Sequence, residues 1–145
     1  HTRLPVVIPQ RICQELLDWV NRCNKKVVFV LHTNHPNEID DHVVEALSAL
    51  RAAGATLLNQ SVLLRDINNS PEVLVKLSRQ LFNTGVLPYY LHLLDPVAGA
   101  QHFDVTEVEG INLIRRISSQ LPGYLVPRLA REIPGADAKQ IISMA

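Results

Sequence analysis

The sequence predicts an α/β fold in which parallel strands form a sheet and helices cover its outside. Three observations support this prediction. Apolar runs of strand length alternate with segments of helical periodicity, the connections between them are short, and the strands end in polar loops. With 145 residues, 47% of them hydrophobic, the chain can bury one core, and we expect a single domain over residues 1–145.

The strands are predicted from apolar runs. Residues 27–31 are wholly apolar and mostly β-branched, which is typical of a strand buried on both faces. Further strands are expected at 56–64 and 87–95, with an extended stretch near 122–135, and residues 1–7 resemble the end of a strand. This last feature suggests that the chain is part of a longer or processed protein.

Helices are predicted between these strands, over 9–23, 37–53, 71–83 and 106–120. Asn34 or Asn37 is the expected cap of the second helix, and Ser70 followed by Pro71 begins the third. Two glycines, Gly54 and Gly85, are expected to end the second and third helices.

Charge and composition exclude several classes of function. Fourteen basic and fourteen acidic residues give zero net charge, so nothing favours nucleic acid or an anionic membrane as a partner. The apolar runs are too short to span a bilayer, and no signal peptide is visible. Cys13 and Cys23 have neither metal-site nor disulfide spacing, which indicates a reducing, cytoplasmic location.

Polar side chains gather where the predicted strands end, at His32, Gln60, His92 and Asp95. The carboxyl ends of parallel strands form one face of such folds, and ligands bind there. The stretch NQSVLL, residues 59–64, places two amides in a strand that should be buried. A buried amide requires a partner, which either the protein or a ligand supplies.

Single residues leave alternatives open. His32, His35 and His92 lack the spacing of a specific metal site, so no metal is expected in this chain. Asp95 before Pro96 forms a turn or binds a substrate ammonium. Lys139 is a solvated surface residue or a functional amine. The common nucleotide and hydrolase motifs are absent.

Five longer stretches together resemble the lysine 2,3-aminomutase family of radical S-adenosylmethionine enzymes. They are HTRLPVVIPQRI, HTNHPNEI, LLNQSVLLRDINN, PYYLHLLDPVAGAQHF and PGYLVPRLAREIPG, and the resemblance runs from His1 to about Lys139. The stretch LAREIPG and the short tail are most similar to the branch that makes β-lysine for elongation factor P. Ser70 stands where zinc-binding members carry a cysteine.

The resemblance implies a fold and a chemistry. The fold would be the C-terminal portion of a partial (β/α)6 barrel, with parallel strands and outer helices. The enzyme would be an isomerase that converts lysine to β-lysine by a radical amino shift. Its cofactors would be S-adenosylmethionine, pyridoxal 5′-phosphate and a [4Fe–4S] cluster, which carry the chemistry while the protein positions them.

The resemblance also assigns roles to residues. Lys139 matches the lysine that binds pyridoxal phosphate, although the family's Lys-Thr-Pro is here Lys139-Gln140-Ile141. Asp95 and Glu132 match carboxylates that hold the ε-ammonium of the lysine substrate. His32 and Gln60 match positions that contact S-adenosylmethionine, so Gln60 would have a cofactor as its partner.

The cluster-binding Cys-x-x-x-Cys-x-x-Cys motif is absent from the sequence, and Cys13 and Cys23 lie on a predicted helix, too far apart to replace it. The chain therefore resembles the C-terminal half of the enzyme, and we expect it to be inactive alone. A half-barrel would expose a strand edge at HTRLPVV, which predicts a homo-oligomer or poor solubility.

Two other functions stay open. One is a free-lysine 2,3-aminomutase of β-lysine metabolism. The other is a non-catalytic α/β module that binds a ligand without radical chemistry.

Overall fold

One mixed sheet organises the chain, and the computed structural model describes residues 1–95 and 99–143 of it. The strands lie in the order of the sequence: β1 (Val28–His32), β2 (Thr56–Val62), β3 (Val86–His92), β4 (Arg128–Arg131) and β5 (Gln140–Ile141). The first four pair in parallel, and β5 pairs with β4 in antiparallel. The predicted α/β class with a largely parallel sheet is confirmed.

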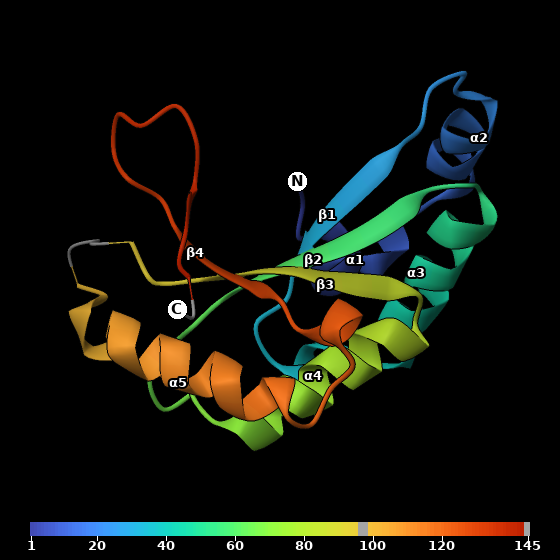
Figure 1. Ribbon diagram of the computed structural model, residues 1–145. Coiled ribbons are helices and arrows are strands. Elements are labelled where there is room, and N and C mark those ends of the chain that lie inside the picture. The colour runs from blue at the N-terminus through green and yellow to red at the C-terminus, as the bar shows by residue number, and fades with distance from the viewer. Residues whose placement is uncertain (96–98, 144–145) are drawn as a thin grey trace.

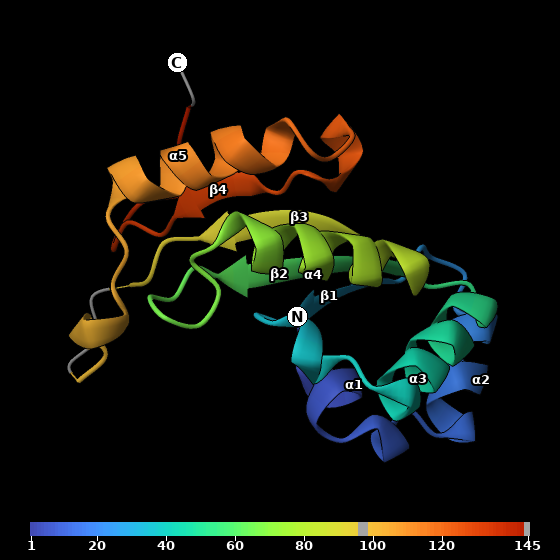
Figure 2. The same cartoon turned by 90° about the horizontal axis from the view of Figure 1, so that it is seen from below.

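The helices are α1 (Leu4–Val7), α2 (Gln14–Arg22), α3 (Asp41–Ala52), α4 (Pro71–Asn83) and α5 (Glu107–Ser118). Short 3-10 turns cover Pro9–Arg11, Pro36–Glu38, Gln101–Phe103 and Gly123–Leu125. Figures 1 and 2 show α4 and α5 against one face of the sheet, while the loop between β4 and β5 extends on the opposite side. No helix in the described part of the chain is long and apolar enough to cross a membrane.

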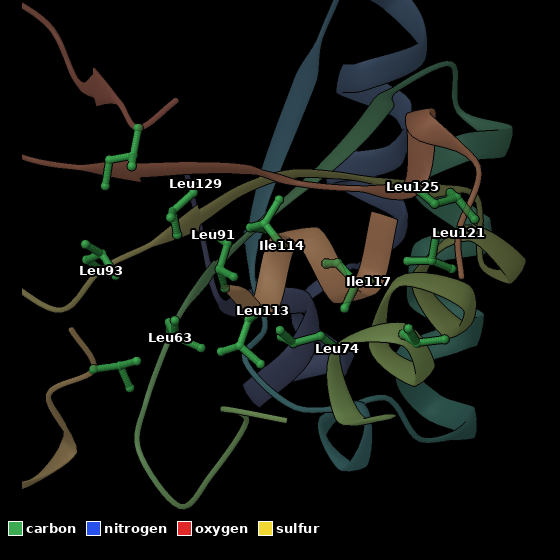
Figure 3. Packing of buried hydrophobic residues seen from close by; sticks show 13 residues of the cluster. Leu63, Leu74, Leu91, Leu93, Leu113, Ile114, Ile117, Leu121, Leu125 and Leu129 are labelled. Atoms are coloured by element: carbon green, nitrogen blue, oxygen red, sulfur yellow. The ribbon is translucent and has the colours of Figure 1, made fainter. Parts of the chain in front are cut away.

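The core lies between the sheet and the helices in two clusters. Figure 3 shows the first, where Leu91 and Leu129 of the sheet lie beside Ile114 of α5. The second joins β1 and β2 to α3 and α4 through residues such as Leu31 and Leu57. Since side chains alternate across a strand, the neighbours of these leucines face away from the helices.

The start of α4 and the ends of α3 and α4 follow the local signals predicted from the sequence. The Ser70 hydroxyl accepts a hydrogen bond from the Val73 amide, and Pro71 begins α4, as predicted. Gly54 and Gly85 follow α3 and α4 with φ of 97° and 79°, a conformation that glycine adopts at little cost.

The cap of α3 was predicted wrongly. Asp40 caps this helix and accepts a hydrogen bond from the Val43 amide, whereas Asn34 and Asn37 precede it. The reason is that Pro36–Glu38 forms a separate 3-10 turn, which delays the start of the helix to Asp41.

The N-terminal segment also departs from the prediction. Only Thr2 bridges to β1, at Leu31, and the rest of HTRLPVV forms the short helix α1, so the strand edge predicted there is wrong. Pro5 favours this helix because proline suits the first helical turn. The predicted helix 9–23 is divided, and Cys13 and Cys23 flank α2 instead of lying within it.

The strand at 27–31 is not buried on both faces. β1 is an outer strand of the described sheet, and Val28 is 49% exposed.

Candidate functional site

Three predicted polar side chains lie at the carboxyl ends of neighbouring strands. His32 ends β1, Gln60 lies near the end of β2, and His92 ends β3. Their strand neighbours Leu31 and Leu91 belong to the core under the helices, so these three side chains occupy the other face of the sheet. We call this the open face, and it is the face above which the β4–β5 loop extends (Figure 1).

His32 and Gln60 contact each other on the open face. The Gln60 side-chain nitrogen donates to Nε2 of His32 at 3.1 Å, which requires a neutral imidazole at that nitrogen. Burial, followed by the charges of the N-terminus, Arg3 and Lys139, lowers the pKa of His32. The side-chain oxygen of Gln60 is buried and has no partner among residues 1–95 and 99–143.

Lys139 and Glu132 form an ion pair at the neck of the β4–β5 loop. Glu132 directly follows β4 and Lys139 directly precedes β5, so the antiparallel pairing of these strands brings the two side chains together. The hydrogen bond and the charge of Lys139 lower the pKa of Glu132. The two sequence-predicted residues are thus neighbours, and Lys139 is not a solvated residue of a tail.

Asp95 and Glu132 line a common pocket of about 440 Å³. The other lining residues are Leu93, Leu94, Gln101, Asp104, Val105, Thr106, Glu107 and Arg131. Four of the lining side chains are carboxylates, and the single cation, Arg131, is paired with Glu107. The unbalanced negative charge suits a ligand that carries a cation.

His92 lies beside these groups and is 7% exposed. Its ring packs against Tyr90, with the centroids 5.5 Å apart. Burial lowers the pKa of His92 most, and the charge of Lys139 lowers it further, while Glu132 and Asp95 act in the opposite direction. His92 is among the polar side chains predicted at the strand ends, and the structure adds that it faces away from the core because Leu91 and Leu93 face into it.

The first amide of NQSVLL, Asn59, forms its hydrogen bonds within the protein. Its side-chain oxygen accepts from the Thr33 amide at 3.0 Å, and its nitrogen donates to the Thr33 carbonyl at 3.1 Å. The Ser61 hydroxyl donates to the same carbonyl. The protein therefore satisfies Asn59 and Ser61, and their bonds fix the chain immediately after His32.

Asn34 was named from the sequence, but its link to a second amide, Asn68, was not foreseen. Asn34 accepts a hydrogen bond from the Val62 amide, and Asn68 donates to the carbonyls of Asn34 and Val62. These bonds tie the loop after β1 to the loop after β2. The available signal was the position of both asparagines in loops that directly follow predicted strands.

No protein-family model matches the chain. Among curated proteins, it is 50% identical to the L-lysine 2,3-aminomutase of Haemophilus influenzae over 141 residues, which are 97% of this chain and 42% of that protein. The corresponding enzyme of Escherichia coli is 49% identical over 139 residues, 96% of this chain and 41% of that protein. The L-lysine 2,3-aminomutase of Clostridium subterminale is 38% identical over 138 residues, 95% of this chain and 33% of that protein.

The chain is similar in sequence to lysine 2,3-aminomutases. It spans about two-fifths of the length of the first two of these relatives, and it aligns along nearly its whole length. The resemblance inferred from the sequence motifs is thereby confirmed.

The residues present fit two of the cofactors that the sequence resemblance implies, pyridoxal phosphate and S-adenosylmethionine. Lys139 brings an amine to the open face, where a carbonyl cofactor could be bound covalently. Two buried polar atoms on this face, Oε1 of Gln60 and Nε2 of His92, have no partner in the described part of the chain and suit a polar ligand.

The residues do not fit an iron–sulfur cluster. Cys13 and Cys23 lie at opposite ends of α2, roughly 15 Å apart at 1.5 Å per residue. Among the described residues, no three His, Cys, Asp or Glu side chains gather to hold a metal ion. His35 uses Nδ1 to accept a hydrogen bond from the Asn37 amide.

Proposed function

We propose that this chain forms the part of a lysine 2,3-aminomutase that holds pyridoxal phosphate, S-adenosylmethionine and the side chain of the lysine substrate. One observation carries the proposal. Lys139 pairs with Glu132, and Glu132 lines one acidic pocket with Asp95, so three residues assigned from separate sequence motifs converge.

In this proposal Lys139 binds the cofactor covalently, and Asp95 and Glu132 bind the substrate's ε-ammonium. Pyridoxal phosphate supplies a carbonyl that accepts amines and a ring that delocalises the charge or unpaired electron that develops. The ion pair with Lys139 keeps the Glu132 carboxylate charged and in position. When the lysine nitrogen is used for the cofactor, the carboxylate becomes available for a second cation, which a lysine substrate provides.

His32 and Gln60 are proposed to contact S-adenosylmethionine. The Gln60 nitrogen uses one of its two hydrogens for His32, and its side-chain oxygen, which is unpaired in the described chain, is the proposed acceptor for the ligand. The Asn59 clamp on Thr33 orients both side chains by joining the ends of β1 and β2.

We further propose that the fold is part of a (β/α)6 barrel. In doubly wound sheets the strand order reverses and helices cover both faces. Here the parallel strands keep sequence order, and α4 and α5 lie on one face, which supports a barrel wall. The proposed product is β-lysine for elongation factor P in the cytoplasm.

The test is conversion of lysine to β-lysine by the full-length protein with S-adenosylmethionine, pyridoxal phosphate and a reductant. Asp95→Asn should raise the KM for lysine at least about tenfold, because the charged acceptor proposed for the substrate ammonium is lost. Asp66→Asn is the matched control, since Asp66 is an exposed turn residue with a φ of 61° that asparagine tolerates. No β-lysine from the unaltered protein would refute the proposal.

The acceptor is tested separately. In cells that lack the full-length protein, elongation factor P should lose the mass of its added lysyl group, and the active protein should restore it. If elongation factor P is unchanged while β-lysine accumulates, the enzyme serves free β-lysine metabolism instead.

A further inference from the structure

One buried imidazole on the open face has a ring nitrogen without a hydrogen-bond partner in the described part of the chain. His92 is 7% exposed, and its Nε2 forms no hydrogen bond within residues 1–95 and 99–143. Buried polar atoms are almost always paired, so an exception calls for a partner from outside the described chain.

The position of His92 directs this nitrogen to the site. Leu91 and Leu93 face the helices, so the imidazole faces the open side, where Tyr90 packs against it. The strand partner of His92 in β4 is Ala130, whose methyl group offers no hydrogen bond.

Charged groups surround the imidazole. Lys139, Glu132 and Asp95 act on it electrostatically, and so does His32 from β1. Burial and the nearby Lys139 charge both disfavour an imidazolium, so His92 is a neutral ring with a single N–H.

We propose that His92 binds the cofactor held at Lys139 by donating a hydrogen bond from Nε2 to an anionic oxygen of pyridoxal phosphate. The inference rests on the proposed function, since it requires Lys139 to hold that cofactor. Pyridoxal phosphate presents oxygen acceptors on its ring and its phosphate, which match a neutral N–H donor. His92 is then a binding residue of the site and has no role as a metal ligand.

The experiment titrates pyridoxal phosphate into the full-length protein and follows its absorbance. His92→Phe keeps a planar ring without a donor and should weaken binding about three- to tenfold, the effect of one hydrogen bond. His92→Gln places an amide N–H near the position of Nε2 and should keep the affinity within about twofold. His42→Phe, at an exposed position on α3, is the control and should bind normally.

Stability separates a binding role from a structural one. Without cofactor, His92→Phe should unfold at the same or a higher temperature than the unaltered protein, because an unpaired buried polar group is removed. A variant that is less stable and binds equally well would show a structural role and overturn the proposal. Equal weakening by Phe and Gln would also overturn it, because the hydrogen bond would then not be the cause.

Borohydride reduction followed by peptide mapping distinguishes failure of the proposed function from failure of the His92 inference alone. If the unaltered protein carries no cofactor on Lys139, the proposed function fails and the His92 inference fails with it. If Lys139 is labelled in every variant and His92→Phe binds pyridoxal phosphate as tightly as the unaltered protein, only the His92 inference fails.

Discussion

At the scale of single residues, the adjacent amides Asn59 and Gln60 have opposite tasks. Asn59 is 2% exposed and satisfied by Thr33 and Ser61, whereas Gln60 keeps a buried oxygen without a partner in the described chain. Alternation along β2 places the first in the core and the second on the open face. The polar character of NQSVLL therefore serves both the fold and the site.

This division predicts different costs for the same substitution. Asn59→Leu leaves the Thr33 amide without its side-chain acceptor and removes one of the two donors to the Thr33 carbonyl, and it should lower the free energy of unfolding by about 3 kcal/mol. Gln60→Leu removes an unpaired oxygen and one hydrogen bond to the half-buried His32, and it should cost less than about 1 kcal/mol. Urea unfolding of the two variants checks this, and equal losses would contradict it.

The lowered pKa values of two histidines predict a pH dependence of stability. The pKa values of His32 and His92 are lowered from 6.5 in the folded state, so the unfolded chain binds more protons. The free energy of unfolding should therefore decrease as the pH falls through about 6.5 towards the folded-state values. His92→Phe should flatten this decrease between about pH 7 and 5 relative to the unaltered protein. A slope that is identical in this variant and the unaltered protein would contradict the burial of His92.

At the scale of elements, α5 illustrates how a cap fixes a helix against the sheet. Thr106 and Glu109 form a capping box, and Arg65 pairs with Glu109. The backbone and hydroxyl of Thr106, assisted by Arg65, lower the pKa of Glu109 to about 2. This helix carries Ile114 and Ile117 of the core and borders the acidic pocket through Thr106 and Glu107.

Loss of this cap should be measurable. Thr106→Ala removes the hydroxyl that accepts from the Glu109 amide and should lower the free energy of unfolding by about 1 kcal/mol. Ser119→Ala, at the exposed C-terminal end of α5, is the comparison and should change it by less than about 0.5 kcal/mol. Urea or thermal unfolding measures both variants. A free energy of unfolding that is unchanged in Thr106→Ala would refute the capping role.

Most elements could be predicted because their signals are local. The alternation of β2, the Ser70–Pro71 start of α4 and the Thr106 start of α5 lie within a few residues of sequence. Strand β5 could not be predicted, since its two residues become a strand only by pairing with β4. The same pairing places Lys139 beside Glu132, so the sequence supplied both residues but not their contact.

At the scale of the whole molecule, the exposed apolar surface near the N-terminus predicts association. Val7, Ile8 and Trp19 are about half exposed, and β1 lies at the edge of the described sheet. We predict that the 145-residue chain, studied alone, forms dimers or larger species by light scattering, and that Trp19→Lys reduces them. A monomer at high concentration would contradict this. The expected strand edge at HTRLPVV is not the cause, because that segment is helical.

The same chain alone should not convert lysine. Its two cysteines are too few for a three-cysteine cluster site, and they lie at opposite ends of α2. Turnover of lysine by the isolated 145 residues with S-adenosylmethionine and reductant would refute this prediction.

The central claim is that Lys139 carries the cofactor, and covalent trapping tests it most directly. The full-length protein is incubated with pyridoxal phosphate, reduced with borohydride, digested and mapped by mass spectrometry. We predict that the reduced cofactor is found on Lys139 and that Lys25, Lys26 and Lys76 are unmodified. Labelling at one of those three lysines with Lys139 untouched, or no labelled lysine at all, would contradict it.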